Sequence, residues 1–249
     1  MNIKVAILAD SLALPRGPAD GDLRFEATYP FVLHQRLRAK FGDEAPYVID
    51  RGKRLRTMED VVYDWGEFVE LTKAEVVIVQ AGVVDCAPRV FLPREHKFVE
   101  GIRSESLRNA ILRFVNKHRR ALVLMRPDRV YVPVPRFRRA VEAVVKKARD
   151  CKVGLLVFVN IVIPPGEIEY RSPGFQKNVT IYNRIICEQA DGKAIHVIDT
   201  NSIMSRHGGP QRLTSDGVHL TGEASNLLAD ILGGHIAEFV VRNSVAALF

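Results

Sequence analysis

The sequence predicts a three-layer α/β domain in which helices cover both faces of a parallel sheet of about five strands. Short apolar runs recur along the chain, as in "IKVAIL" at residues 3–8 and "AEVVIVQAG" at residues 74–82. Most of these runs are followed by a segment with the spacing of an amphipathic helix, and this alternation is typical of a parallel sheet. The 249 residues contain no internal repeat, low-complexity tract or evident linker, so we expect a single domain over residues 1–249.

Five apolar runs are expected to form the strands. The run at 74–82 gives the strongest signal, because residues 76–79 are all β-branched and Gly82 closes the run, as in a strand buried on both faces. The run at 152–164 ends at two consecutive prolines, which cannot continue a ladder of hydrogen bonds. The expected strands are residues 3–8, 47–50, 74–82, 152–164 and 194–199.

The segments between these runs are expected to be helical. The last helix places Leu228, Leu232 and Ile236 on one side, which would pack on the sheet. Residues 126–135 hold three prolines and are expected to be a loop. The charged, helical and proline-bearing segment of about 91–136 is expected to be an insertion that forms a lid over the binding pocket. The expected helices are residues 28–41, 58–69, 106–125, 136–150, 174–190 and 221–243.

The composition is that of a globular protein with an excess of basic residues. Apolar residues make up 47% of the chain, enough for a core that needs no disulfide or metal. The net charge of +7 suits an anionic ligand, such as a phosphorylated, nucleotide-linked or acidic sugar, and equally a merely solvated basic surface. Aromatic residues make up 8% and lie mostly in apolar patterns. Nucleic-acid binding is therefore not expected, since it needs a basic face with aromatic platforms.

Several classes of protein are not expected from the sequence. The three cysteines are widely spaced and fit reduced thiols better than a disulfide framework. The N-terminal "MNIKVAILAD" is strand-like rather than a signal peptide, and no apolar run approaches the roughly 20 residues of a bilayer span. We therefore expect a cytoplasmic protein with no membrane partner. Neither a metal nor a cofactor is expected, because no metal-ligand spacing, GxGxxG motif or Walker loop occurs.

Two short segments far apart in the chain carry residues that suit nucleophilic catalysis. Ser11 follows the first expected strand, at the sheet edge where α/β proteins bind ligands. A serine needs a base, and "DGVH" at residues 216–219 places Asp216 and His219 on one turn just before the last helix. The alternative is structural: Asp10 and Ser11 end a strand, Asp216 shapes a turn and Thr221 caps the helix.

Taken together and in order, the motifs "ADSL" at 9–12, "AGVVD" at 81–85 and "DGVH" at 216–219 resemble the SGNH (GDSL) hydrolase superfamily. The resemblance covers the whole chain and implies the flavodoxin-like α/β fold of that superfamily. It implies that Ser11 is the nucleophile, His219 the general base and acid, and Asp216 the carboxylate that orients the histidine. It further implies an oxyanion hole made from the serine N–H, a glycine N–H of the second block and the asparagine of the third.

The chain departs from this pattern in the oxyanion hole. Val84 stands where the third block has asparagine, and valine offers no hydrogen-bond donor. In the second block, Gly52 is the candidate glycine, although the alignment equally allows Leu55 or Arg56 at that place. The further candidates for oxyanion or substrate binding are Gly82, Arg89 and Asn160, and Arg51, Lys53 and Arg54 are candidates to contact an anionic substrate.

The function expected from these features is that of a serine-dependent esterase. It would act through an acyl-enzyme on a small or carbohydrate ester, such as an acetyl ester, and an anionic group on the substrate would suit the basic residues named above. Two alternatives stay open at this point. One is a sugar O-acyltransferase, and the other is a catalytically weak module that binds an anionic sugar or nucleotide-sugar, which the valine at position 84 suggests.

Overall fold

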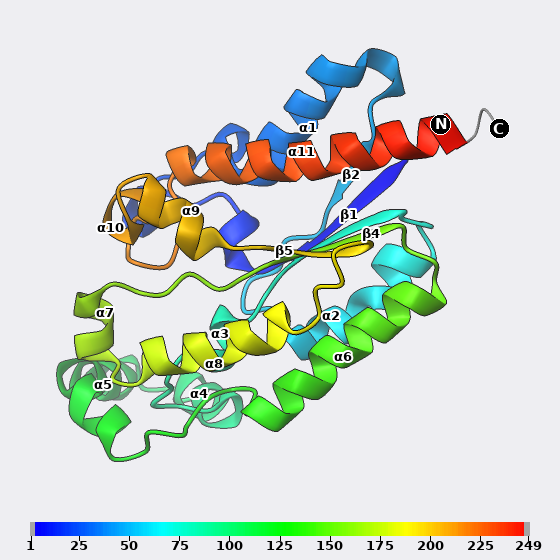
Figure 1. The fold of residues 1–249 in the computed structure, drawn as a ribbon. Helices are drawn as coiled ribbons and strands as arrows, with labels where there is room; N and C mark the ends of the chain where they lie inside the picture. The colour runs from blue at the N-terminus through cyan, green and yellow to red at the C-terminus, as the bar shows by residue number, and fades with distance from the viewer. Residues whose placement is uncertain (1–2, 247–249) are drawn as a thin grey trace.

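The computed structural model describes residues 3–246, in which five parallel strands form one sheet between two layers of helices (Figure 1). The strand order is β2-β1-β3-β4-β5. This confirms the predicted α/β class, and the order is that of a flavodoxin-like doubly wound sheet. The strands are β1 (Lys4–Ala9), β2 (Tyr47–Asp50), β3 (Val76–Gln80), β4 (Leu155–Val159) and β5 (Ile195–Ile198).

Both faces of the sheet are buried, and alternate residues of each strand enter different cores. In β1, Val5, Ile7 and Ala9 pack under α1 and α11, whereas Ala6 and Leu8 pack against α2, α6 and α8. The two-residue period of a strand produces this division. The helices are α1 (Tyr29–Phe41), α2 (Met58–Trp65), α3 (Val83–Cys86), α4 (Pro93–Glu100), α5 (Glu105–Leu124), α6 (Val134–Asp150), α7 (Gly166–Arg171), α8 (Phe175–Cys187), α9 (Thr200–Arg206), α10 (Pro210–Leu213) and α11 (Gly222–Ala246).

Two expected boundaries are wrong for identifiable reasons. The loop expected at 126–135 ends earlier, because α6 begins at Val134 and takes Pro135 into its first turn. Proline fits there because the first turn of a helix needs no hydrogen bond from that backbone nitrogen. The strand expected at 152–164 is shorter, because the chain leaves the sheet after Val159. The apolar run continues through Ile161 and Val162, which are buried in the two cores rather than in the ladder.

The insertion and the C-terminal helix occupy opposite sides of the molecule. Helices α4 and α5 fill most of residues 91–136 and lie beyond α8 in Figure 1, away from α1 and α11. Helix α11 runs along α1, and its Gly222–Ser244 span is long and apolar enough to cross a membrane. Half of that span is buried inside the fold, however, and a core helix passes the same test.

Candidate active site

Ser11 stands directly after β1, at the carboxyl edge of the sheet. Asp10 is extended, and its side chain accepts a hydrogen bond from the Leu12 N–H at 2.9 Å, which caps the single 3₁₀ turn Ser11–Ala13. The turn halts the strand and exposes Ser11 beside the end of β3. Strand order reverses between β1 and β3, and ligands bind at such a point in open α/β sheets.

The loop before α11 is folded so that Asp216 and His219 face each other. Gly217 has a φ of +84°, and a Cβ at this position would lie 2.8 Å from Ile168 Cγ1, so glycine is required here on both grounds. The tight turn lets Asp216 Oδ1 accept hydrogen bonds from the N–H groups of Val218 at 3.0 Å and His219 at 2.8 Å. The backbone therefore fixes the carboxylate before any side-chain contact is made.

Ser11, His219 and Asp216 form a continuous hydrogen-bonded series. His219 Nδ1 lies 2.7 Å from Asp216 Oδ2, and His219 Nε2 lies 3.2 Å from Ser11 Oγ. Burial raises the pKa of Asp216. Hydrogen bonds from the His219 ring, the His219 N–H and the Val218 N–H, together with the His219 charge, lower it by more, so the pKa lies below its usual value. An ionised Asp216 keeps the imidazole proton on Nδ1, which leaves Nε2 free to accept the serine proton.

A cavity of about 490 Å³ opens in front of these side chains. Arg54 and Leu55 of the loop after β2 border it, and no described residue forms an ion pair or hydrogen bond with the Arg54 guanidinium. Ser215 also lines it, and nothing in the sequence marks this residue except that it directly precedes Asp216. The full lining is Ser11, Leu14, Pro15, Arg16, Ala19, Gly21, Arg54, Leu55, Ser215, Asp216 and His219.

Two buried carboxyl groups lie behind the nucleophile. Asp10 is 1% exposed and Asp85 is fully buried. The charge of Asp10 adds to the rise in the pKa of Asp85, and both charges add to the rise in the pKa of the buried Cys86 thiol. Burial is the main cause that raises the pKa of each carboxyl group to about 7. Asp10 Oδ2 is buried and accepts no hydrogen bond in the described structure, whereas Asp85 accepts one from the Met58 N–H at 3.0 Å. A neutral, protonated Asp10 is consistent with this environment.

Two of the predicted binding residues are not brought to the cavity. Asn160 is buried and ties the ends of β4 and β5 together, since its amide donates to Asp199 at 3.0 Å and its oxygen accepts from the Thr200 N–H at 2.9 Å. Arg89 lies 4.3 Å from the ring centroid of Tyr131 and donates to the Val84 carbonyl at 3.2 Å. Both side chains are thus engaged in packing the fold, and neither lines the Ser11 cavity.

The two predicted glycines also have structural roles. The Gly52 N–H donates to Asp50 Oδ1 at 3.0 Å, so it is already satisfied, and a Cβ there would lie 2.6 Å from Leu14 Cδ2. Gly82 has a φ of +129°, and a Cβ there would lie 2.6 Å from Ile161 Cδ1. Neither glycine is among the residues that line the cavity.

Leu55 occupies the place that a glycine would favour. It has a φ of +59° and is the third residue of a turn closed by the Arg56 N–H and the Lys53 carbonyl at 3.3 Å. A positive φ at this position normally selects glycine. The Leu55 N–H donates to no other described residue, and Leu55 lines the cavity with Ser11. The "KRLR" stretch does not predict this turn, because the position with positive φ holds leucine instead of glycine.

The basic residues after β2 divide into different roles. Lys53 pairs with Asp60 at 3.3 Å, and the Arg51 guanidinium lies 5.2 Å from the ring centroid of Phe68. Arg54 alone of the three borders the Ser11 cavity. The sequence places all three near this edge, but only the fold shows which side chain is left for a ligand.

The expected lid is wrong for this structure. No residue that lines the Ser11 cavity comes from 91–136. The reason is that α5 packs against α7, where Arg119 of α5 donates hydrogen bonds to Ser172 and to the Pro88 carbonyl. Over residues 3–246, no group of three or more His, Cys, Asp or Glu side chains is arranged to hold a metal ion.

Comparison with solved structures supports the fold over nearly the whole chain. A lipase/acylhydrolase from Enterococcus faecalis superposes with a TM-score of 0.63 at 14% identity, covering 94% of this chain and 95% of that one. An acetyl-xylooligosaccharide esterase from Geobacillus stearothermophilus gives 0.60 at 17% identity, with 92% and 93% covered. An α/β hydrolase from the Lake Arreo metagenome also gives 0.60, at 16% identity, with 92% and 93% covered.

Comparison of the sequence with curated proteins and with family models gives two results. No match is found among curated proteins. The family model of the GDSL-like lipase/acylhydrolase family, in contrast, matches residues 10–227, which include both the serine after β1 and the Asp–His turn before α11. The chain therefore belongs to the GDSL-like lipase/acylhydrolase family and is an ester hydrolase.

Proposed function

We propose that the chain is a serine esterase in which Ser11 attacks the ester carbonyl and forms an acyl-enzyme. The observation that carries this proposal is the series from Ser11 Oγ through His219 to Asp216, which joins residues 208 positions apart in sequence. His219 accepts the serine proton through Nε2 and passes it to the leaving alcohol. Water then attacks the acyl group with the same histidine as base, which releases the acid.

The oxyanion is held by backbone groups in this proposal. The N–H of Ser11 and the N–H of Leu55 donate to no other described residue, and both residues border the cavity. Two such donors stabilise the developing negative charge, and each is worth on the order of 100-fold or more in rate. This arrangement replaces the asparagine side chain that Val84 lacks.

The substrate in this proposal is a small or carbohydrate ester with an acidic group near the acyl centre. The cavity of about 490 Å³ suits a ligand of modest size, and Arg54, which pairs with no described residue, supplies a cation on its wall. Solved neighbours with the same fold include an acetyl-xylooligosaccharide esterase, which supports a carbohydrate ester such as an acetylated sugar acid.

Covalent labelling tests the nucleophile directly. We expect a fluorophosphonate to add once to the wild type and not to Ser11→Ala, as measured by intact mass. Ser215→Ala is the matched control, because Ser215 lines the same cavity but makes no contact with the His219 ring in the described structure. An adduct that survives in Ser11→Ala and disappears in Ser215→Ala would show that the assignment of the nucleophile is wrong.

A further inference from the structure

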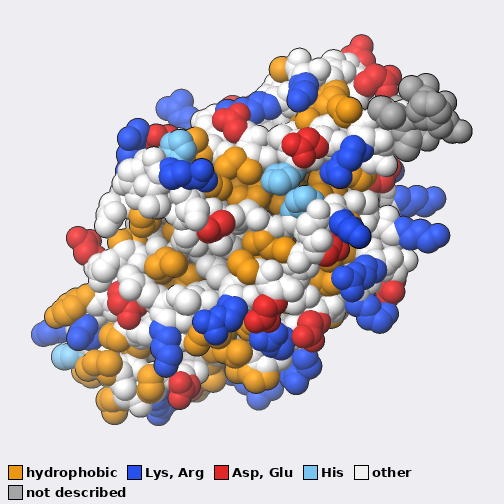
Figure 2. Space-filling model, in the orientation of Figure 1, with side chains coloured by type: hydrophobic (Ala, Val, Ile, Leu, Met, Phe, Trp, Pro, Cys, Tyr) orange, Lys and Arg blue, Asp and Glu red, His pale blue; other side chains and the backbone are white. Residues whose placement is uncertain are grey.

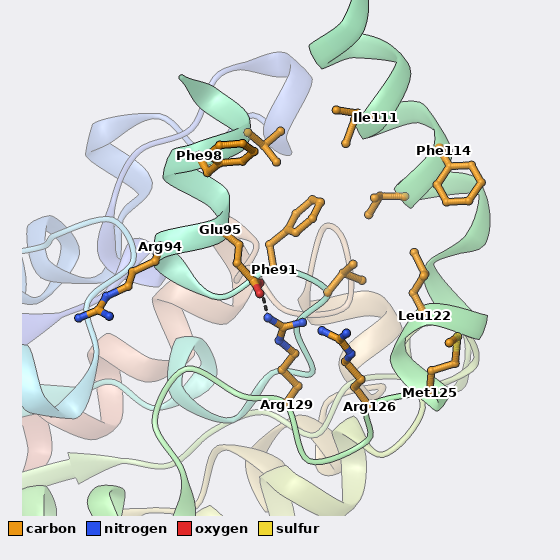
Figure 3. A pocket seen from close by; sticks show the side chains of 13 residues that line it. Phe91, Arg94, Glu95, Phe98, Ile111, Phe114, Leu122, Met125, Arg126 and Arg129 are labelled. Carbon is orange, nitrogen blue, oxygen red and sulfur yellow. Dashed lines mark ion pairs between the residues drawn. The ribbon is translucent and has the colours of Figure 1, made fainter. Parts of the chain in front are cut away.

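A second cavity lies between α4 and α5, and it shares no lining residue with the Ser11 cavity. Its volume is about 620 Å³, which lies within the range of small-ligand sites. Figure 3 shows Phe91 projecting into the space between the two helices, with Phe98 on α4 and Ile111 and Leu122 on α5 around it. The remaining lining residues are Val90, Arg94, Glu95, Val99, Phe114, Val115, Met125, Arg126 and Arg129.

The apolar side chains of this cavity are not used by the protein core. Of the 20 residues of α5 only Val123 is buried, and of α4 only Val99. Phe98 and Met125 are each 76% exposed and Phe114 is 58% exposed, although all three line the cavity. A hairpin that leaves this much apolar surface in water has room for an apolar ligand that would cover it.

The charge of the protein is concentrated on the same segment. Residues 91–136 carry 11 Lys and Arg against 4 Asp and Glu, a net charge of +7, which equals that of the whole chain. The other 203 residues are therefore neutral in sum. Figure 2 shows basic and apolar side chains mixed over the end of the molecule where Figure 1 places α4 and α5. An apolar ligand that fits this surface should carry a negative charge.

Of the three arginines that line the cavity, Arg94 points away from it in Figure 3, so Arg129 and Arg126 are the two whose charges face the ligand space. Arg129 forms an ion pair with Glu95, and this contact together with the Leu92 N–H keeps the pKa of Glu95 below its usual value. Glu95 therefore stays ionised and neutralises Arg129. Arg126 forms no side-chain ion pair or hydrogen bond with any described residue, and Figure 3 shows it rising toward the cavity beside the Arg129–Glu95 pair.

We propose that this cavity binds an amphiphile with one acyl or alkyl chain and an anionic head, the chain packing among Phe91, Phe98 and Phe114 and the head on Arg126. Carboxylate and phosphate heads both pair well with a guanidinium. The site is separate from the ester-hydrolysing site and does not depend on the function proposed for it. The ligand is a free single-chain amphiphile rather than a lipid whose head is presented at a bilayer surface, because its chain occupies the cavity.

Titration calorimetry with dodecyl phosphate, below its micelle concentration, tests the proposal. We expect saturable binding of one molecule that is at least tenfold tighter than binding of butyl phosphate or dodecanol. Arg126→Glu should weaken it at least tenfold, whereas Arg113→Glu should change it less than threefold. Arg113 is the matched control because it is exposed on α5 outside the cavity and the change in net charge is the same. Hydrolysis of a short soluble ester should be unchanged in both variants.

Vesicles of phosphatidylglycerol test whether a bilayer surface competes for the site. Loss of bound dodecyl phosphate that is no greater than with neutral phosphatidylcholine vesicles, which take up the probe in the same way, supports a free amphiphile, and a greater loss would overturn the proposal. The proposal is overturned if dodecyl phosphate binds no tighter than butyl phosphate. It is also overturned if the two arginine variants weaken binding equally, or if the protein binds vesicles but not the monomeric probe, since these results indicate a diffuse basic surface.

Discussion

Replacing Asp10 by asparagine should remove a large part of the pH dependence of stability. Burial raises the pKa of Asp10 from 3.8 to about 7, and this effect outweighs the Leu12 N–H bond and the charges of His219 and Arg56, which lower it. The folded protein therefore keeps the proton over a range of pH in which the unfolded chain has lost it. A group of this kind contributes stability that is complete below about pH 4 and is lost as the pH rises through about 7.

The size of the effect follows from the same two pKa values. Between pH 5 and pH 7 the unfolded carboxyl is ionised and the folded one is not, and each unit of pH costs about 1.4 kcal/mol. The free energy of unfolding should thus fall by on the order of 3 kcal/mol from pH 5 to pH 8 through Asp10. Asp85 behaves similarly, but the two carboxyl groups interact through their charges, so the contributions do not simply add.

Urea unfolding at pH 5 and pH 8 measures this difference. Asp10→Asn keeps an oxygen that accepts the Leu12 N–H bond at 2.9 Å but cannot ionise, so its free energy of unfolding should fall less than that of the wild type by on the order of 3 kcal/mol. Asp128→Asn, at an exposed position, is the control and should follow the wild type. Parallel losses of stability in the wild type and in Asp10→Asn would refute the reasoning.

Three further predictions concern the reaction. Asp216→Asn retains an oxygen for the two backbone N–H groups but presents an amide to His219 Nδ1. In an esterase assay kcat should therefore fall on the order of 10⁴-fold. Calorimetry should show little change in melting temperature. Arg54→Gln should raise KM at least tenfold for an acidic ester and not for a neutral one, whereas Arg51→Gln should alter neither. Val84→Asn should raise kcat on a short-chain ester less than tenfold if backbone groups already hold the oxyanion, and a rise of 100-fold or more would contradict that arrangement.

The parts of the fold that follow a strong local pattern could be predicted from the sequence. All five strands were expected within a few residues at each end except the C-terminal end of β4, and the reason is that a buried parallel strand is a continuous apolar run. The predicted range for β4 is too long at its C-terminal end, because Ile161 and Val162 are buried outside the ladder. Apolar character does not show whether a residue is buried in the sheet or beside it. The sequence predicts a helical insertion here but does not give the bounds of α4, since its apolar residues are few and only Val99 is buried.

The candidate site divides in the same way. The turn that carries Asp216 and His219 is formed by four consecutive residues with Gly217 at its second position, so it could be predicted from the "DGVH" segment alone. The partners of Asn160 and Arg89 are long-range: Thr200 and Tyr131 lie about 40 residues away in sequence, and nothing near either residue shows that it is already engaged. Polar residues near a sheet edge can line a site or hold the sheet ends together, and only their contacts distinguish the two roles.

The distribution of charge changes what the basic composition says about the substrate. A net charge of +7 over the chain suggested an anionic ligand for the active site, but the charge excess lies in residues 91–136, which do not line the Ser11 cavity. Charges on that exposed hairpin are largely screened beyond about 8 Å at physiological salt. They therefore do not determine whether the separate Ser11 cavity prefers an anionic substrate. The preference of the Ser11 cavity for an acidic substrate depends instead on Arg54 on its wall, because the other lining arginine, Arg16, donates to the Leu220 carbonyl. The global charge concerns what α4 and α5 bind. Ionic strength should therefore alter amphiphile binding by the hairpin more strongly than it alters hydrolysis of a neutral ester at Ser11.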